Sequence, residues 1–308
     1  MKMNQVYDVI VVGSGPAGLS AAIYGQRAGL SMIVMEASYV SGGQVQNTYE
    51  VDNYPGLPGV SGMELAEKFR AHAENMGTEF VRAEVTGITE DEGVKTIHTK
   101  DGNYRTKAVI LAPGATHRML GVPGEAKLAG MGVSYCATCD GAFFRNKTVA
   151  VIGGGDVAVE DAIFLARGCK KVYVVHRRDQ LRAAGILQKR LMELDNVVMK
   201  WDSVVDEIVG EEQVEAVKLH HVKTGREEMC EVDGVFVAVG IQPNSEAFRG
   251  LVDADEAGYL IAGEDTKTSH AGIFAAGDVR TKMLRQIITA TADGANAITA
   301  VQEYLLKL

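Results

Sequence analysis

One pattern occurs twice in the 308-residue chain: an apolar strand, a glycine-rich turn, an alanine-rich helix and a second apolar strand. The first copy, at residues 7–38, is YDVIVVGSGPAGLSAAIYGQRAGLSMIVMEAS, and the second, at 147–178, is KTVAVIGGGDVAVEDAIFLARGCKKVYVVHRR. Each copy predicts a βαβ unit. Because a hairpin-like segment follows each copy, at residues 94–115 and 214–241, the sequence predicts two related nucleotide-binding α/β halves.

Both glycine-rich turns lie between a predicted strand and a predicted helix, which makes them stronger signals than an isolated G-x-G-x-x-G match. The first glycine permits the turn, the second lets backbone approach a pyrophosphate, and the third allows close packing of helix on strand. The helix N-terminus offers N–H groups and a positive dipole to the phosphates. A tight turn without ligand is the alternative. The predicted contacts are Gly13, Ser14, Gly15, Pro16, Ala17 and Gly18 in the first copy, and Gly153, Gly155, Asp156, Val157 and Ala158 in the second.

The ends of the second strands distinguish the two nucleotides. Glu36 stands where an acidic side chain accepts hydrogen bonds from an adenosine ribose. His176 occupies the same place in the second copy and is followed by Arg177, Arg178 and Arg182. Guanidinium groups pair with a 2′-phosphate, whereas a carboxylate repels it. We therefore expect an unphosphorylated adenosine in the first half and NADP(H) in the second; a solvated charged turn is the alternative for the arginines.

A further apolar strand is predicted within TSHAGIFAAGDVR, residues 268–280, and it ends at Gly277 and Asp278. A short acidic side chain at such a strand end can bind the hydroxyl groups of a ribityl chain, and an ordinary strand and turn is the alternative. Residues 285–308 predict a helix whose N-terminal dipole would favour a reduced, anionic flavin ring.

Composition argues against several classes of partner. The net charge of −9 and the pI near 5.4 give no basic field for nucleic acid. The N-terminal MKMNQVYDVIVVG lacks the features of a signal peptide, and no run of about 18 apolar residues predicts a membrane span. We therefore expect a cytoplasmic protein without a membrane partner, in which four cysteines are too few for a disulfide scaffold.

Cys136 and Cys139 are separated by two residues, and Asp140 follows directly. Such a pair is part of a metal-binding site, a structural disulfide or a redox centre. A closed zinc site usually needs two such pairs, and the two other cysteines are isolated from each other. A mixed site with a histidine is the remaining metal alternative. In a reducing compartment a redox pair fits better, and we expect no metal. A carboxyl with its pKa raised by apolar neighbours can protonate a thiolate, although Asp140 as a helix cap is the plainer alternative.

Five motifs, distributed over essentially the whole chain, resemble those of the low-molecular-weight bacterial thioredoxin reductases. They are GSGPAG at 13–18, CATCD at 136–140, GGGDVA at 153–158, HRRDQLRA at 176–183 and GIFAAGD at 272–278. The resemblance implies FAD-dependent transfer of electrons from NADPH to oxidised thioredoxin, carried out by a homodimer. It also implies that Cys139 is the thiolate facing the flavin, Cys136 the nucleophile that attacks thioredoxin, and Asp140 the acid.

The resemblance assigns further cofactor contacts. The loop SGGQVQNTYEVDNYPG at 41–56 is similar to a loop that lies along FAD, with Gly42, Gly43, Gln44 and Asn53 as contacts. The segment near the flavin ring is matched by Arg285, Gln286 and Ile287, and NADPH contacts by Ile241 and Tyr259. One departure is Pro113, where the family usually has threonine; proline lacks an N–H, so a contact at that place would be lost.

The implied architecture is α/β, with two three-layer Rossmann-like nucleotide-binding domains, the second inserted into the first. The FAD-binding domain is expected at 1–116 and 247–308, and the NADPH-binding domain, which carries the cysteine pair, at 117–246. Because nicotinamide and disulfide need the same flavin, the family alternates them by rotating one domain on the other. The crossings near 117 and 246 are the expected hinges.

Three other interpretations are weighed against this one. A flavoprotein of the same architecture with another donor or acceptor, such as a ferredoxin-linked reductase or a dithiol oxidase, is disfavoured by the arginine cluster. The alkyl-hydroperoxide reductase flavoprotein has an N-terminal thioredoxin-like region, for which there is no room before Tyr7. A non-catalytic NADPH or redox sensor would not need both FAD segments.

Overall fold

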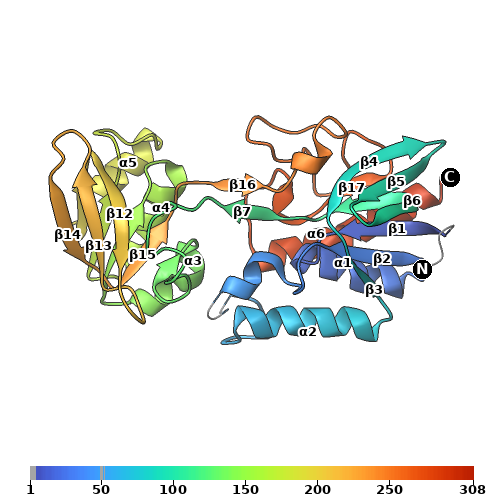
Figure 1. Ribbon diagram of the computed structural model, residues 1–308, viewed down its shortest axis with the longest axis horizontal. Coiled ribbons are helices and arrows are strands. Elements are labelled where there is room, and N and C mark those ends of the chain that lie inside the picture. The colour runs from blue at the N-terminus through green and yellow to red at the C-terminus, as the bar shows by residue number, and fades with distance from the viewer. Residues whose placement is uncertain (1–4, 49–50, 52) are drawn as a thin grey trace. The chain divides into compact units, whose positions relative to one another are not determined.

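The computed structural model describes residues 5–48, 51 and 53–308 (Figure 1). The start of the chain and part of the predicted cofactor loop, at 49, 50 and 52, lie outside these residues. The chain divides into two compact units: one comprises Met1–Gln46, Tyr54–Thr116 and Gln242–Leu308, and the other comprises Asn47–Asn53 and His117–Ile241. The chain order therefore inserts the second unit into the first. Which nucleotide each unit holds stays a prediction, as do the domain boundaries drawn from the sequence.

The first unit is built on a mixed sheet in the order β3-β2-β1-β6-β5-β4, with β17 added to β6. The pairs β3-β2, β2-β1, β1-β6 and β17-β6 are parallel, whereas the pairs β6-β5 and β5-β4 are antiparallel. The strands are β1 (Val6–Val12), β2 (Met32–Glu36), β3 (Glu79–Arg82), β4 (Val85–Asp91), β5 (Val94–Thr99), β6 (Gly102–Leu111) and β17 (Ile273–Ala275). The helices are α1 (Pro16–Arg27), α2 (Gly62–Asn75), α6 (Ile287–Leu305) and the 3-10 turns η1 (Gly43–Asn47), η3 (Glu246–Phe248) and η4 (Gly277–Val279).

Alternation along β1 divides the core of the first unit into two layers. Val9 and Val11 face the cluster that contains the buried residues of α1 and α6, whereas Ile10 and Val12 face the opposite cluster. Small residues bring the backbones of the two helices close together: a side chain at Gly294 of α6 would stand 2.1 Å from the carbonyl oxygen of Ala17 in α1. This close approach fixes α1, and with it the first glycine-rich turn, against α6.

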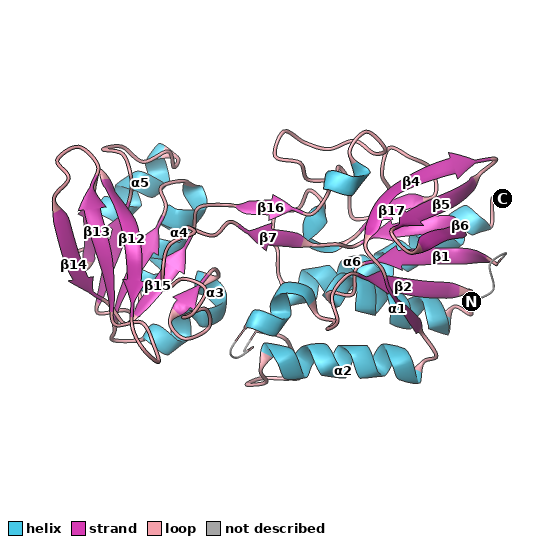
Figure 2. Cartoon of the chain, in the orientation of Figure 1, coloured by secondary structure: helices cyan, strands magenta, loops and turns pink. Residues whose placement is uncertain are grey.

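The second unit contains a parallel sheet in the order β11-β10-β9-β15-β8 and a separate antiparallel sheet, β12-β13-β14 (Figure 2). Its strands are β8 (Val133–Ser134), β9 (Thr148–Ile152), β10 (Lys171–Val175), β11 (Val197–Lys200), β12 (Ser203–Val209), β13 (Ala216–His221), β14 (Glu227–Glu231) and β15 (Gly234–Val237). Its helices are α3 (Ala137–Asp140), η2 (Gly141–Phe144), α4 (Asp156–Ala166) and α5 (Gly185–Met192).

Alternation along β9 separates the layers of the second unit in the same way. Val149 and Val151 face the helical cluster, and Ala150 and Ile152 face the cluster that contains the antiparallel sheet. Helices, parallel sheet and antiparallel sheet are therefore three layers, and the predicted fold class, two three-layer Rossmann-like halves, is confirmed.

The two crossings between the units run through the strand pair β7 (Ala115–His117) and β16 (Ile241–Pro243). Within the first unit, Asn244 N–H donates to the carbonyl of Gly114 at 3.0 Å, and within the second, Arg118 N–H donates to that of Gly240 at 2.9 Å. Both connections are thus held by backbone hydrogen bonds. No helix in the described part of the chain is long and apolar enough to cross a membrane.

Candidate functional site

The first glycine-rich turn leads from β1 into α1. Gly13 has φ of +103°, and a side chain there would stand 2.2 Å from the carbonyl oxygen of Ala112. Gly15 is the N-cap of α1, and no side chain of the described residues caps this helix end. A Cβ at Gly15 would meet no described heavy atom within 4 Å. A helix N-terminus with open space before it can receive a phosphate group.

Glu36, at the end of β2, is tied to this turn. Its Oε2 accepts hydrogen bonds from the N–H of Ser14 at 2.8 Å and from the Ser14 hydroxyl at 2.7 Å, and its Oε1 accepts one from Ser38 N–H at 2.9 Å. Each carboxylate oxygen has room for about two acceptor contacts, so Oε1 keeps capacity for a ribose hydroxyl. The structure thus brings Glu36 and the glycine-rich turn together.

Two other predicted segments reach the same turn from distant parts of the sequence. Gly42 N–H donates to the carbonyl of Ser14 at 2.8 Å, and a Cβ at Gly43 would lie 3.6 Å from Cα of Gly15. A Cβ at Gly277, on η4, would lie 2.9 Å from Cβ of Ala17. The glycines allow both segments of backbone to approach the start of α1 closely.

Asp278 and Gln44 show that these segments are suited to a polar ligand. Asp278 Oδ1 and Gln44 Oε1 are buried and have no hydrogen-bond partner among the described residues, although the Gln44 amide does donate to the carbonyl of Ala115. Burial raises the pKa of Asp278, while Lys282 and Arg285 act to lower it. Buried oxygens without partners are costly, so ligand hydroxyl or N–H groups are their natural partners. The residues present therefore fit a dinucleotide of the FAD type.

Arg280, Lys282 and Asp293 form a buried ion cluster that contacts η4. Asp293 of α6 accepts hydrogen bonds from Gly277 N–H at 2.8 Å, from Arg280 Nε and Nη2 at 2.9 and 2.7 Å, and from Lys282 Nζ at 2.8 Å. Burial acts to raise the pKa of Asp293, but the bonds from Arg280 and Lys282 outweigh it and lower the pKa. Asp293 is 2% exposed, so its charge fixes the backbone immediately before Asp278.

The remaining predicted contacts are spread over both units. Arg285 lies over the ring of Tyr259 at 4.0 Å, so Tyr259, predicted to contact NADPH, stands in the first unit beside a predicted FAD contact. Gln286 is the N-cap of α6, with Thr289 completing a capping box, and Ile287 is the first residue of the helix. Asn53 and Ile241 belong to segments of the second unit.

The second glycine-rich turn repeats the geometry of the first. A side chain at Gly153 would stand 2.4 Å from the carbonyl oxygen of Ala238, while one at Gly155, the N-cap of α4, would meet no described heavy atom within 4 Å. Asp156 Oδ1 accepts a hydrogen bond from Ala184 N–H at 2.7 Å, and Val157 is 58% exposed. Ala158 is fully buried. The turn therefore also offers an open, uncapped helix N-terminus.

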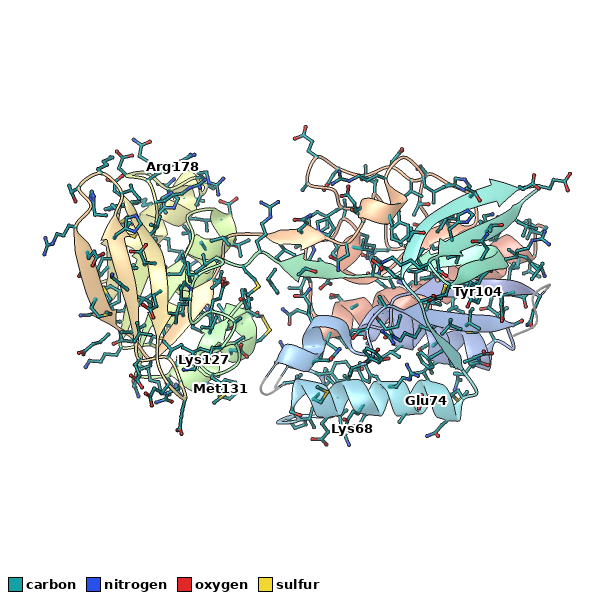
Figure 3. The ribbon with its side chains drawn as sticks, in the orientation of Figure 1. Lys68, Glu74, Tyr104, Lys127, Met131 and Arg178 are labelled. Carbon is teal, nitrogen blue, oxygen red and sulfur yellow. A yellow bond between two sulfur atoms is a disulfide. The ribbon has the colours of Figure 1, made fainter. Side chains whose placement is uncertain are left out.

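The predicted phosphate cluster separates into one buried and three exposed residues. The His176 ring lies against Gly154, where a Cβ would stand 2.2 Å from its Nδ1, and burial lowers the pKa of this histidine. Arg177, Arg178 and Arg182 are exposed, and Arg178 is labelled in Figure 3. Arg182 N–H donates to the carbonyl of Gly154 at 2.7 Å, which anchors the arginine loop to the turn.

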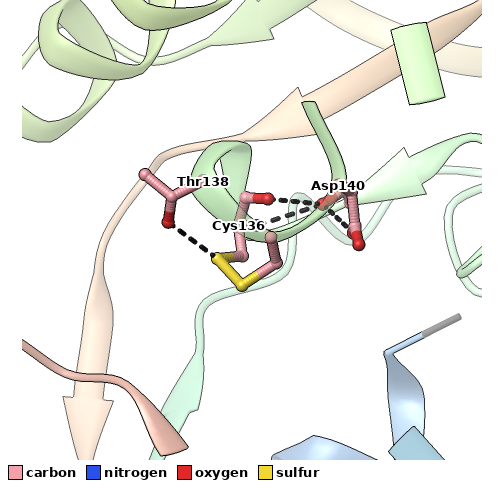
Figure 4. The surroundings of a disulfide bond; sticks show 5 residues. Cys136, Thr138 and Asp140 are labelled. Atoms are coloured by element: carbon pink, nitrogen blue, oxygen red, sulfur yellow. Dashed lines mark hydrogen bonds between the residues drawn. A yellow bond between two sulfur atoms is a disulfide. The ribbon is translucent and has the colours of Figure 1, made fainter. Parts of the chain in front are cut away.

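Cys136 and Cys139 form a disulfide with a Cα–Cα distance of 5.3 Å (Figure 4). Cys136 is the N-cap of the short helix α3, and the N–H groups of Cys139 and Asp140 donate to its carbonyl at 3.2 and 3.1 Å. The Thr138 hydroxyl lies 3.4 Å from the Cys136 sulfur. One helical turn thus carries both sulfurs and the acid that follows them.

Asp140 is a buried carboxyl beside this disulfide. Its Oδ2 accepts a hydrogen bond from the Ser134 hydroxyl at 2.6 Å, while its Oδ1 is buried without a partner among the described residues. Burial raises the pKa of Asp140, and the bond from Ser134 acts to lower it. A carboxyl with a raised pKa can hold a proton that an ordinary aspartate has lost, and can act as an acid.

The other cysteines take no part in this site. Cys169 and Cys230 are free thiols in two different core clusters, and burial raises the pKa of Cys169 to about 11. Such thiols remain protonated and unreactive at neutral pH. Within the described residues, no group of three or more His, Cys, Asp and Glu side chains could hold a metal ion.

Two functional neighbours were not anticipated from the sequence. No sequence pattern predicted a role for Ser134, apart from its position two residues before Cys136. Asp293 had one: it is the single charged residue in IITATADGANAITAV, the apolar and alanine-rich part of α6. A charge in an otherwise buried stretch implies a buried ionic partner, but sequence does not name that partner.

Comparison with known proteins agrees with this geometry. Residues 7–294 match the model of the family described as pyridine nucleotide-disulphide oxidoreductase. The chain is 46% identical over 306 residues to the thioredoxin reductase of Listeria innocua, covering 99% of this chain and 96% of that protein. It is 44% identical over 309 residues to that of Bacillus subtilis, covering 100% of this chain and 98% of the relative. The structure of thioredoxin reductase from Streptococcus pyogenes matches with a TM-score of 0.95 and 47% identity, covering 99% of this chain and 100% of that one.

The chain therefore belongs to the pyridine nucleotide-disulphide oxidoreductase family. The relatives just described are all named thioredoxin reductase, and the match runs through both units and both glycine-rich turns. The predicted resemblance is confirmed.

Proposed function

We propose that the protein is an NADPH-dependent thioredoxin-disulfide reductase that uses FAD and the Cys136–Cys139 disulfide. The observation that carries the proposal is this disulfide on a single helical turn beside the buried acid Asp140. The full-length similarity to proteins named thioredoxin reductase supports thioredoxin as the acceptor. The acceptor, the donor and the individual contacts below are parts of this proposal.

The first unit holds FAD. The start of α1 receives its pyrophosphate, Glu36 binds its adenosine ribose, and Asp278 and Gln44 bind polar groups of the remainder through the oxygens that have no protein partner. When bound, FAD supplies the disulfide with two electrons that it takes from NADPH as a hydride. The other proposed FAD contacts complete this site. They are the glycines of the first turn, of the loop after β2 and of η4, together with Arg285, Gln286 and Ile287.

The second unit holds NADPH and the dithiol. The start of α4 receives the NADPH pyrophosphate, and the exposed arginines bind its 2′-phosphate. His176 does not pair with the 2′-phosphate as the arginines do, because it is buried and its lowered pKa leaves it uncharged at neutral pH. Its ring packs against Gly154 of the glycine-rich turn. Cys136 attacks the thioredoxin disulfide, Cys139 faces the flavin, and Asp140 supplies a proton.

The test is an anaerobic titration of the purified protein with NADPH, followed by oxidised thioredoxin, while the flavin absorbance is recorded. We expect NADPH to bleach the flavin, the protein to take up more than two electrons per flavin, and thioredoxin to restore the oxidised spectrum. Bleaching without recovery would contradict thioredoxin as the acceptor. Absence of bleaching by NADPH, with bleaching by reduced ferredoxin, would favour the ferredoxin-linked alternative.

Replacing both Arg177 and Arg178 by alanine is expected to weaken NADPH binding by about 100-fold and NADH binding by less than about threefold, because only NADPH carries the 2′-phosphate that they pair with. The measurement is KM for each nucleotide in flavin reduction. The matched control is Arg167→Ala, which removes an arginine at the other end of α4. Equal losses for both nucleotides would contradict a 2′-phosphate site.

The proposed working form is a homodimer in the cytoplasm. The first unit exposes the apolar side chains of Met283, Leu284 and Ile288, by 101%, 53% and 44%, next to the start of α6. Apolar side chains grouped on a surface are typical of an interface, which supports association. Sedimentation velocity at micromolar concentration is expected to give twice the chain mass of 32.9 kDa.

A further inference from the structure

We propose that Ser134 is a positioning residue that directs the acid proton of Asp140 to Oδ1, the oxygen free to donate it. This inference rests on the proposed function, because it concerns how the acid of that reaction is prepared. Ser134 lies on β8, is 6% exposed, and touches both the acid and the backbone of the redox pair.

The hydrogen bonds of Ser134 fix the direction in which its hydroxyl donates. Its Oγ accepts the N–H of Cys136 at 3.1 Å, because a backbone N–H can only donate. The single hydroxyl proton then has two acceptors, Asp140 Oδ2 at 2.6 Å and the Cys136 carbonyl at 3.3 Å. The shorter bond to a carboxyl oxygen is the stronger one. The chain of donation therefore runs from Cys136 N–H through Ser134 to Asp140 Oδ2.

This direction decides which oxygen of Asp140 carries the proton. Oδ2 is already an acceptor, so a proton on it would compete with the Ser134 hydroxyl for the same space. Oδ1 is buried and has no partner among the described residues. The neutral acid thus keeps its proton on Oδ1, where no protein acceptor holds it back.

The elements packed against α3 bring few other charges toward Asp140. On α3 itself the two cysteines are in the disulfide, and β8 contributes Ser134. Helix α4 packs against α3 and carries Glu160 and Asp161, and burial raises the pKa of Asp161 to about 7. The 3-10 turn η2 brings aromatic and glycine residues. Because burial brings the pKa of Asp161 near neutrality, Asp161 is the acid on α4 whose titration the test has to separate from that of Asp140.

The proton serves the exchange with thioredoxin. The Cys136 thiolate attacks one sulfur of the thioredoxin disulfide, so that a new S–S bond forms as the old one breaks, and the leaving thiolate takes the proton from Asp140 Oδ1. The Cys139 thiolate then attacks the Cys136 sulfur, so that the bond between Cys136 and thioredoxin breaks as the protein disulfide forms again. The second thioredoxin sulfur leaves as a thiolate and takes a proton from solvent. The two electrons originate in NADPH, and Asp140 regains its proton from solvent.

The test is a pH titration of the carboxyl group of Asp140 by infrared difference spectroscopy, with Asp140→Asn identifying its C=O band. In Ser134→Ala we expect the pKa of Asp140 to rise by about 0.5 to 1 unit, because a bond to the charged form is lost, and the C=O band to move to higher frequency, because Oδ2 loses its donor. Ser134→Thr should restore both. A fall in the pKa would show that Asp140 donates to Ser134, and would overturn the proposal.

Kinetics give the second readout. The rate of the exchange with thioredoxin is expected to fall at high pH as Asp140 ionises, and this fall is the alkaline limb of the pH–rate profile. Ser134→Ala should move the alkaline limb to higher pH and lower the maximal rate at lower pH by about tenfold. Asp161→Asn should leave the limb in place, and a shift in that variant instead would assign the limb to Asp161. Ser203→Ala, which removes another buried serine hydroxyl, bound to the Trp201 carbonyl at 2.7 Å, is the matched control. Wild-type protein that fails to reduce thioredoxin contradicts the proposed function, whereas normal turnover with an unchanged Ser134→Ala profile contradicts this inference alone.

Discussion

Cys139→Ser is expected to lower NADPH-driven thioredoxin reduction by at least about 1000-fold while flavin and NADPH binding stay intact. Serine replaces one sulfur of the Cys136–Cys139 pair, so no disulfide can form and no dithiol can pass two electrons to thioredoxin. Neither glycine-rich turn contains Cys139, so NADPH should still bleach the flavin. The measurement combines steady-state thioredoxin reduction with an anaerobic titration, in which electron uptake should fall by two per flavin.

The matched control for this variant is Cys230→Ala, which removes a buried free thiol from the core beside the antiparallel sheet. It should retain near-normal turnover and full electron uptake. Retained thioredoxin turnover in Cys139→Ser would contradict the proposed route through the disulfide. Loss of flavin bleaching in the same variant would instead mean that the substitution damages the fold or a nucleotide site.

Local sequence patterns predicted the two glycine-rich turns because their requirements are themselves local. A strand, a bend without side chains and a helix start are encoded within a few residues, and the open, uncapped starts of α1 and α4 follow from Gly15 and Gly155. The same holds for the cysteine pair, since residues at i and i+3 share one helical turn. For these features chain neighbours are also spatial neighbours.

Sequence reasoning missed two kinds of feature. One is contact between residues that are far apart in the chain, and the other is the difference in burial between neighbouring residues of one charged motif. Charge pattern grouped His176 with the arginines, but its ring is covered by Gly154 while they remain exposed. The approach of Gly277 to the start of α1 depends on how β17 lies beside β6. No periodicity encodes that arrangement, because packing of the whole sheet sets it. The residue pattern did predict a strand that ends at Gly277 and Asp278, and the family resemblance supported it, but neither predicted its approach to α1.

Asp293→Ala is expected to destabilise the protein by about 3 to 5 kcal/mol, because it leaves the buried charges of Arg280 and Lys282 without their shared carboxylate. Gly277 N–H also loses its acceptor, so the turn that carries Asp278 loosens. We therefore expect FAD affinity to fall by about tenfold or more. Thermal unfolding of the apoprotein reports the first effect, and quenching of flavin fluorescence as FAD binds reports the second.

Asp293→Asn separates the roles of charge and shape in case the alanine variant fails to fold. Its side-chain oxygen can still accept from Gly277 N–H, but it no longer neutralises Arg280 and Lys282, so stability should lie between wild type and Asp293→Ala. Glu303→Ala is the control on the same helix: Glu303 pairs with Lys267 at 3.3 Å in a half-exposed position, and its loss should change stability by less than about 0.5 kcal/mol. If Asp293→Asn matched wild type in both stability and FAD affinity, the buried charge would have no role in holding the turn. Normal FAD affinity in a destabilised variant would instead mean that the ion cluster stabilises the fold but does not contribute to FAD binding.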